Sequence, residues 1–252
     1  MRIIYCTYLL IVALPVLAIV TILASLSTIV GCTCGYAKFW GYWPARIWSW
    51  CMIRVLLLPV HVEGREKIDK KTSYVFVANH QGNFDIFLIY AFLGHDLRWM
   101  MKKSLRKIFL IGKACESAGH IFVDKRGPKA IKKTYDTARN ILQGGASVVV
   151  FPEGARTFTG HMGYFKKGAF QLADELQLPV VPITLNGPFD VMPRTTSNPF
   201  IKRAKLSIIV HDPIFPNGKG HESELETMEK AYNAVMGGLP KDRQGYVQND
   251  DQ

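Results

Sequence analysis

The chain has 252 residues, a formal net charge of +11 and a hydrophobic content of 48%. This length suits one α/β domain with a sizeable core, or a membrane segment followed by a somewhat smaller domain, and we favour the second. The positive charge predicts an anionic partner, which could be nucleic acid, an acidic membrane surface or a phosphorylated substrate. The five cysteines include no C-x-x-C pair, which argues against a disulfide framework and a zinc site and favours a reducing, cytosolic environment.

The first part of the chain is apolar. No charged residue occurs between Ile3 and Ala37, and this run exceeds the ~20 apolar residues that are needed to span a bilayer. We therefore predict a membrane segment. A cleaved signal peptide is disfavoured because the run is too long for its hydrophobic region, because only Arg2 precedes it, and because a second apolar stretch follows.

The second apolar stretch covers residues 39–60 and combines tryptophans with Arg46 and Arg54. This composition is typical of the boundary between lipid and water, so we expect the stretch to lie in or dip into the interface. The sequence leaves open whether the two stretches form one span plus an interfacial helix or a hairpin within one leaflet. Lys38 and both arginines follow the first stretch, which predicts that the remainder of the protein faces the cytoplasm.

Charge becomes frequent after residue 62, and short apolar runs then alternate with helical patterns. This alternation predicts an α/β domain with a mostly parallel mixed sheet flanked by helices over residues 63–240, preceded by a membrane-embedded helical segment over 1–62 and followed by a polar, loosely attached tail over 241–252. A ligand site should lie at the carboxyl ends of the strands. The predicted strands cover residues 74–78, 97–100, 121–123, 147–151, 180–185 and 205–211, and the predicted helices cover residues 86–93, 104–118, 128–143, 168–176 and 222–236.

One of these strands is unusual because Pro179 precedes it and Pro182 lies within it. Proline cannot donate to a strand ladder, so residues 180–185 cannot form an ordinary central strand throughout.

His80 and Asp85 follow the end of the strand over residues 74–78. The intervening Asn, Gln and Gly residues favour a turn, and apolar residues resume at Phe84, so Asp85 should lie in the first turn of a helix. On one straight helix the two side chains would point roughly 140° apart at ~100° per residue. Across a strand-to-helix turn, Asp85 can instead reach the imidazole and leave its other nitrogen free as a base. The alternative is that Asp85 only stabilises a helix N-terminus.

A second strand, over residues 147–151, also ends in polar residues, namely Glu153, Gly154 and Arg156. Parallel strands would bring them to the same edge as His80. Gly154 permits close backbone approach, and Arg156 offers a planar group that can bind phosphate. The alternative is a turn with a solvated arginine.

Further cations follow two other strand ends. Lys125 and Arg126 come after the strand over residues 121–123, and Lys102 and Lys103 lead into the next predicted helix. They could meet an anion, although for a lysine pair taken alone a solvated surface is the more common explanation. Among the remaining histidines, His120 is expected to be structural or to lie at the rim of the site.

The sequence lacks the motifs of several other kinds of enzyme and binding site. No G-x-S-x-G sequence is present, so nothing indicates a covalent acyl-enzyme. The chain also has no phosphate-binding Walker loop, no dinucleotide-binding glycine pattern and no zinc signature.

Four blocks in one order resemble the glycerolipid acyltransferase family, in particular the bacterial type of 1-acylglycerol-3-phosphate acyltransferase. The resemblance extends over residues 63–213. It implies that His80 is the general base, that Asp85 orients it, that Lys125 or Arg126 together with Arg156 binds the phosphate of the acceptor, and that Glu153 and Gly154 shape the pocket. The four blocks read NHQGNFD, GHIFVDKR, FPEGAR with FKKGAF, and VVPI, and the last is expected to help form the acyl channel.

The chain departs from the family pattern at a few positions. Arg usually follows the Asp of the second block directly, whereas here Lys125 intervenes before Arg126, so either residue could make the phosphate contact. Ala155 stands where the family commonly has Thr, and Gly82 stands where Ser is frequent. These changes remove no ionisable group.

The resemblance implies transfer of an acyl chain from a thioester to the 2-hydroxyl of lysophosphatidic acid, with acyl carrier protein or coenzyme A as the donor and with no metal or cofactor. Backbone amides after His80 or near Gly154 are candidates for holding the oxyanion. Other lysolipids or glycerol 3-phosphate are alternative acceptors, and a non-catalytic module that binds anionic lipids is an alternative of another class. Nucleic acid is a weaker candidate partner because the positive charge lies at strand ends beside a membrane segment.

Overall fold

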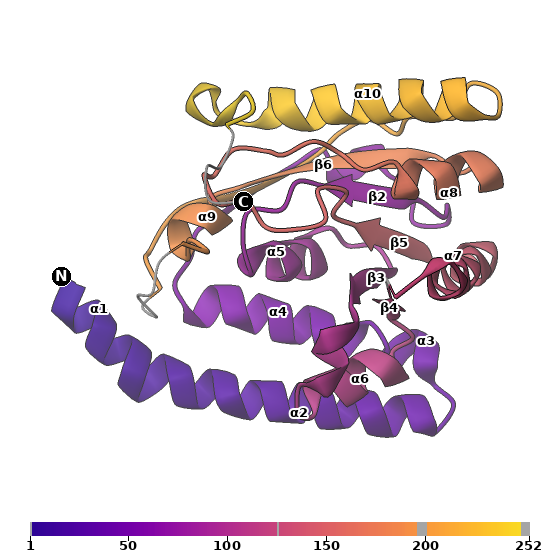
Figure 1. Cartoon of the computed structure of the whole chain (residues 1–252). Coiled ribbons are helices and arrows are strands. Elements are labelled where there is room, and N and C mark those ends of the chain that lie inside the picture. Colours follow the sequence, from indigo (N-terminus) through magenta and orange to yellow (C-terminus); the bar gives the residue numbers. More distant parts are fainter. Residues whose placement is uncertain (1, 125, 196–200, 248–252) are drawn as a thin grey trace.

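The computed structural model describes residues 2–124, 126–195 and 201–247. A seven-stranded sheet lies at its centre in the order β1-β7-β6-β2-β5-β3-β4, with helices on both faces (Figure 1). The strands are β1 (Val60–Glu63), β2 (Val75–Ala78), β3 (Leu97–Lys102), β4 (Ile121–Val123), β5 (Ser147–Val150), β6 (Val180–Asn186) and β7 (Leu206–Val210).

The sheet is mostly parallel, as predicted. Every neighbouring pair runs parallel except β6 and β7, which are antiparallel. Strands β2 to β6 therefore share one direction, and their carboxyl ends lie along one edge. His80 and Asp85 follow β2, and Glu153, Gly154 and Arg156 follow β5. These two groups of polar residues therefore follow adjacent strands of the sheet.

Strand β2 is buried on both faces because it lies inside the sheet. Val75 and Val77 belong to one apolar cluster, whereas Phe76 and Ala78 belong to another, as the alternation of side chains along a strand requires. Helices α4 and α5 cover the face of Phe76, and α7, α8 and α10 cover the opposite face (Figure 1). These helices are α4 (Trp43–Val55), α5 (Phe84–Phe92), α7 (Pro128–Gln143), α8 (Gly168–Leu176) and α10 (His221–Gly238), and a short helix α9 (Pro188–Val191) follows β6.

Strand β6 is central, yet its ladder is interrupted at Pro182, as predicted. Ile183 pairs with Val210, and Val180 pairs with Ile214, so two residues of β6 oppose three on the other side. The Pro182 carbonyl accepts a hydrogen bond from His211 at 3.0 Å. The proline nitrogen points to the same side as this carbonyl, so it faces the interrupted part of the ladder, where no donor is required.

Several elements differ from those predicted, among them α9, β1 and the helix expected over residues 104–118. Strand β1 was not among the predicted strands, because three of its four residues lie in the segment over 1–62 that we assigned to the membrane. The single helix predicted over residues 104–118 is divided into the 3₁₀ helix η3 (Lys103–Lys107) and α6 (Ile111–Ser117). Leu110 has a φ of 58° at this break, and Gly112 lies so close to the carbonyl of Arg106 that a Cβ atom would clash with it.

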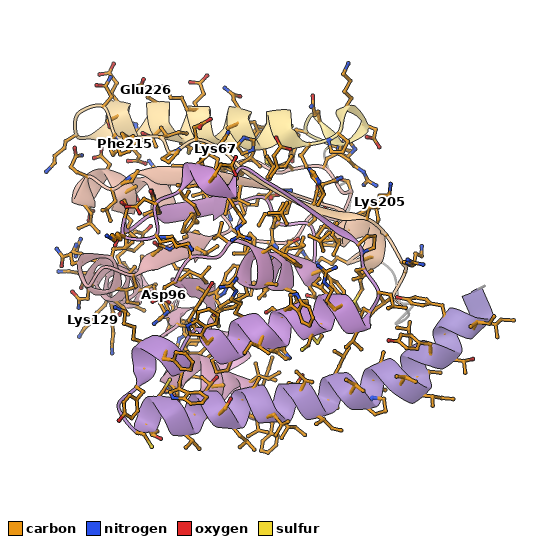
Figure 2. All side chains as sticks on the ribbon, turned by 180° about the vertical axis from the view of Figure 1, so that it is seen from behind. Lys67, Asp96, Lys129, Lys205, Phe215 and Glu226 are labelled. Atoms are coloured by element: carbon orange, nitrogen blue, oxygen red, sulfur yellow. The ribbon has the colours of Figure 1, made fainter. Side chains whose placement is uncertain are left out.

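The N-terminal apolar run forms α1 (Arg2–Tyr8), the π-helix η1 (Leu9–Ala13) and α2 (Leu14–Thr33). Its residues Ile3–Thr33 form a helix of 31 residues that contains an 18-residue window with a mean hydropathy of 2.8, and this helix is long and apolar enough to cross a membrane. Leu9, Ala13 and Leu17 are spaced by four residues and are buried against the protein. Figure 2 shows side chains projecting from the outer surface of this helix. Large apolar residues of the helix, such as Leu14 and Leu23, are exposed.

The second apolar stretch folds back on the first. It forms α3 (Ala37–Trp40) and α4, and α4 lies along α2 (Figure 1). The hydroxyls of Tyr5 and Tyr8 donate to the carbonyls of Leu56 and Val55 at 2.8 and 2.7 Å, which satisfies acceptors at the carboxyl end of α4. The two stretches thus form a helical hairpin. Its placement within one leaflet or across the bilayer stays a prediction.

Part of the C-terminal tail is attached to the domain, contrary to our expectation. Arg243 donates to Asp190 at 2.7 Å, and the ring of Tyr246 stacks on that of Tyr164 with centroids 4.5 Å apart. The polar composition did not reveal these contacts because both partners lie far away in the sequence. Residues 248–252 of the predicted tail lie outside the described residues.

Candidate functional site

The turn between β2 and α5 brings His80 and Asp85 together, as predicted. Imidazole Nδ1 lies 2.6 Å from Asp85 Oδ2, and this oxygen also accepts the Gly82 N–H at 2.9 Å. The Asp85 side chain is completely buried. Burial raises the pKa of Asp85, and its contact with His80 opposes that rise. Because Nδ1 faces the carboxylate, Nε2 is the nitrogen left to act on a substrate.

The His80 residue is held at several other points. Its N–H donates to Glu153 Oε1 at 2.6 Å, and its carbonyl accepts the Thr157 N–H at 2.8 Å. Its ring lies parallel to the ring of Phe151, with centroids 3.9 Å apart and an interplanar angle of 6°. Among the residues that the structure describes, Nε2 has no hydrogen-bond partner, so the imidazole is fixed everywhere except at the nitrogen that would act as a base.

Glu153 joins two loops at the edge of the sheet. Its second oxygen, Oε2, accepts the Gly163 N–H at 2.7 Å, while Oε1 accepts the N–H of His80. Burial raises the pKa of Glu153 to about 8, and the two backbone donors act against this rise. Gly154 follows with a φ of +79°, a conformation that favours glycine, and Lys166 lies beside it. The carboxylate therefore supports the backbone of the base.

Arg156 follows β5 and lies at the same edge of the sheet as the base, as predicted. Its Nη1 donates to Asn83 Oδ1 at 2.8 Å, and its carbonyl accepts from Arg194 Nη1 at 3.1 Å. Asn83 lies between His80 and Asp85 in the chain. One hydrogen bond thus connects a guanidinium group to the turn that carries the base.

The cations of the other two strand ends are partly neutralised. Asp124 accepts from Lys103 Nζ at 2.7 Å and from Arg126 Nε and Nη2 at 2.9 and 2.8 Å. These hydrogen bonds, foremost that of Arg126, hold the pKa of Asp124 well below its usual range. Lys102 is the exposed last residue of β3, and Lys125 lies outside the described residues.

This ion-pair cluster lies away from the end of β2 along the sheet. Strands β5 and β3 separate β4 from β2, so at ~4.8 Å per strand the end of β4 lies about 14 Å along the sheet from the end of β2. We expected Lys125 and Arg126 of this block to be available to an anion. The adjacent carboxylate of Asp124 already binds Arg126, and it also binds Lys103 from the end of β3. Lys125 lies outside the described residues. Their binding of a phosphate stays a prediction.

The structure also bears on the oxyanion donors and on His120. We expected backbone amides after His80 or near Gly154 to hold the oxyanion. Two amides of these turns, the N–H groups of Gly82 and Gly154, already donate to Asp85 and to the carbonyl of Phe151, and the identity of the oxyanion donors stays a prediction. His120 is structural, as expected. It is buried between the Tyr90 hydroxyl, 2.8 Å from Nε2, and the Trp99 N–H, and burial lowers its pKa to about 3.

Sequence reasoning missed three residues of the site. Phe151 stacks on the base, Asn83 binds Arg156, and Asn79 fixes the end of β2 by exchanging hydrogen bonds of 2.8 and 2.7 Å with the Leu185 backbone. All three lie inside the sequence motifs that we had identified. The motifs indicated that these positions are near the site, but they did not indicate which residues the three side chains contact. The residues VVPI of the fourth block are buried in β6, and their part in an acyl channel stays a prediction.

A histidine supported by a buried carboxylate, at the carboxyl edge of a parallel sheet and next to an arginine, defines a general-base site suited to an anionic substrate with a hydroxyl group. The family model described as Acyltransferase matches residues 59–186, a range that contains this whole site. The chain belongs to the acyltransferase family.

Individual relatives agree with this assignment. The chain is 32% identical over 180 residues to 1-acyl-sn-glycerol-3-phosphate acyltransferase LPAT1, chloroplastic, of Arabidopsis thaliana, which covers 71% of this chain and 50% of that protein. It is 33% identical over 145 residues to 1-acyl-sn-glycerol-3-phosphate acyltransferase of Saccharomyces cerevisiae, with coverage of 56% and 48%. The chain spans about half the length of these curated relatives.

A solved structure is similar over almost the whole chain. The crystal structure of the 1-acyl-sn-glycerophosphate (LPA) acyltransferase PlsC from Thermotoga maritima matches with a TM-score of 0.68 and 25% sequence identity, covering 92% of this chain and 100% of that one. The fold class and the family resemblance that the four sequence blocks implied are confirmed.

Proposed function

We propose that this protein transfers an acyl chain from a thioester to the 2-hydroxyl of 1-acyl-sn-glycerol 3-phosphate and so forms phosphatidic acid. The observation that carries the proposal is the 2.6 Å contact between His80 Nδ1 and the completely buried Asp85. It leaves Nε2 as the single proton acceptor of a fixed imidazole. The names of the relatives support the choice of acceptor.

The reaction uses His80 as a general base. Nε2 takes the proton of the acceptor hydroxyl while its oxygen attacks the carbonyl carbon of the thioester. Asp85 stabilises the imidazolium that forms, because its carboxylate faces Nδ1–H. The carbon–sulfur bond then breaks, and the thiolate leaves and receives the proton from the imidazolium. No covalent acyl-enzyme is required.

Arg156 is placed to meet the phosphate of the acceptor. A guanidinium group binds phosphate through two parallel N–H groups, and its single described side-chain bond to Asn83 uses only Nη1. We assign Lys102, Lys103, Lys125 and Arg126 a secondary role in attracting the phosphate or an acidic donor. Acyl carrier protein and acyl-coenzyme A are both anionic donors that suit a chain of charge +11.

An acceptor that resides in a bilayer accounts for the apolar helical hairpin. We propose that the hairpin associates with the cytoplasmic membrane and that the catalytic domain faces the cytoplasm, on the basis of the cations Lys38, Arg46 and Arg54. The arrangement lets the acceptor keep its acyl chain in lipid while its head group reaches Arg156.

The test is an assay of the purified full chain in mixed micelles, which crosses acyl carrier protein and coenzyme A thioesters with lysophosphatidic acid, other lysolipids and glycerol 3-phosphate. Thiol release and phosphatidic acid are measured together. We expect turnover with lysophosphatidic acid that His80→Ala abolishes and that the control His61→Ala, at an exposed histidine of β1, retains. Turnover with another acceptor alone would reassign the substrate. Lipid binding without turnover for any pair of substrates would favour the non-catalytic alternative.

A further inference from the structure

The ring of Phe151 covers one face of the base. Phe151 follows β5, the neighbour of β2, and its side chain belongs to the same side of the sheet as Phe76 and Ala78. The two ring centroids are 3.9 Å apart and the planes differ by 6°. This separation is shorter than the about 4.5–7 Å that aromatic pairs usually adopt, so His80 lies in direct face-to-face contact with a benzene ring.

The Phe151 ring is itself held in place. The Gly154 N–H donates to the Phe151 carbonyl at 3.0 Å, and the following Pro152 carbonyl accepts the Lys166 N–H at 2.9 Å. The buried indole of Trp99 lies against the same phenyl ring, with centroids 5.4 Å apart and an interplanar angle of 27°. The ring therefore has little freedom to withdraw when the charge of the imidazole changes.

This contact differs in strength between the two protonation states of the base. A parallel, face-to-face stack of two neutral rings is not the arrangement that aromatic quadrupoles favour. A cation over the face of the ring is attracted to it. The attraction thus appears when His80 has taken a proton, which occurs as the acceptor hydroxyl attacks, and an interaction confined to that stage raises kcat.

The contact complements the one with Asp85. The carboxylate binds Nδ1 in the plane of the imidazole, and Nε2 is needed in the same plane for the substrate. Only the faces of the ring remain for further stabilisation of the charge. Phe151 occupies one face and leaves both nitrogens to their functions.

We propose that Phe151 is a positioning residue that stabilises the imidazolium form of His80 through its π face, an inference that rests on the proposed function. In the step concerned, the hydroxyl proton passes to His80 Nε2 as the new carbon–oxygen bond forms. The proton later leaves with the thiolate after the carbon–sulfur bond breaks. No bond to Phe151 forms or breaks.

The test replaces Phe151 in the full chain by phenylalanines with one, two and three ring fluorines, which withdraw electron density from the π face while nearly preserving the shape. We expect log kcat to fall with each added fluorine, with KM for the acceptor unchanged. The total loss should be about 2- to 30-fold, because cation–π attractions contribute about 0.5–2 kcal/mol and 1.36 kcal/mol corresponds to a factor of ten. The matched control is the same series at Phe170, which is buried in the cluster on the opposite face of the sheet and should show no trend.

Two results would overturn the inference. The first is a fluorinated series at Phe151 without a trend in kcat, which would show that the ring only packs against His80 and does not stabilise its charge. The second is the absence of an upfield shift of the His80 ring protons in NMR spectra of histidine-labelled protein, assigned with His80→Gln, since protons above a phenyl face are shielded. Phe151→Leu should abolish this shift. A wild-type chain without thioester turnover would refute the proposed function, whereas turnover with a flat fluorine series would refute only the role of Phe151.

Discussion

Replacing Glu153 by Gln should change how the stability of the protein depends on pH. Burial raises the pKa of this carboxyl from 4.5 to about 8, so the folded state favours the protonated form. The stability associated with that form is fully present below pH 4.5 and is lost as the pH rises through 8. At 1.36 kcal/mol for each unit of pKa, the shift corresponds to about 5 kcal/mol between these limits.

Glutamine cannot ionise, so the Glu153→Gln variant lacks this dependence. Its amide also turns an N–H donor toward His80 or Gly163, which lowers its stability by an amount that does not vary with pH. The free energy of unfolding of the wild type relative to the variant should therefore fall by about 5 kcal/mol in total as the pH rises from below 4.5 to above 8.

The assay is denaturant or thermal unfolding of both proteins in the same detergent across this pH range. For a chain of this size about 1 kcal/mol shifts Tm by roughly 2–4 °C, so the difference in Tm should change by roughly 10–20 °C. Glu222→Gln, at an exposed carboxylate of α10, controls for the loss of one acidic residue. A difference between the wild type and Glu153→Gln that stays constant from pH 4.5 to 8 would refute the reasoning.

Three further substitutions test the site by steady-state kinetics with lysophosphatidic acid. Asp85→Asn should lower kcat by about 10²- to 10⁴-fold with little change in KM, since it removes support from the base; an unchanged kcat would contradict the dyad. Arg156→Ala should mainly raise the acceptor KM, because phosphate is charged already in the ground state; a loss confined to kcat would exclude this contact. Asp124→Asn should lower the acceptor KM, because it frees Lys103 and Arg126 for phosphate, and a raised KM would count against both cations.

The parts of the site that are local in sequence could be predicted. His80 and Asp85 lie five positions apart, and the turn residues between the end of β2 and the start of α5 indicated that the chain folds back there. The contacts of Phe151 and Glu153 with His80 could not be predicted, because they depend on β5 lying next to β2. Strand order is a property of the whole sheet, and no sequence pattern in either strand encodes it.

Other differences between the predicted and the observed structure depend on local backbone geometry. The break between η3 and α6 falls at Leu110, which has a positive φ although it is not a glycine. The nearby Gly112 alone did not distinguish a break from a continuous helix. The neutralisation of Arg126 by Asp124 was visible as a spacing of two residues, but whether the side chains pair with each other or meet a ligand depends on backbone geometry at the strand end. The hydrophobic pattern thus predicted the helices and strands. The partners of the polar side chains became known only from the arrangement of these elements in space.

The apolar helices and the base are parts of one structure. Leu17 of α2 and Ile53 of α4 belong to the same buried cluster as Phe76 of β2, and Phe151 packs against that cluster. The hairpin therefore cannot move relative to the sheet without opening the core on the face where Phe151 contacts His80. Packed helices lie about 8–10 Å apart, so the outer apolar surface of α2 has a fixed height relative to the base. Under the proposed function this rigidity sets how far a lysolipid must rise from the bilayer for its 2-hydroxyl to reach Nε2.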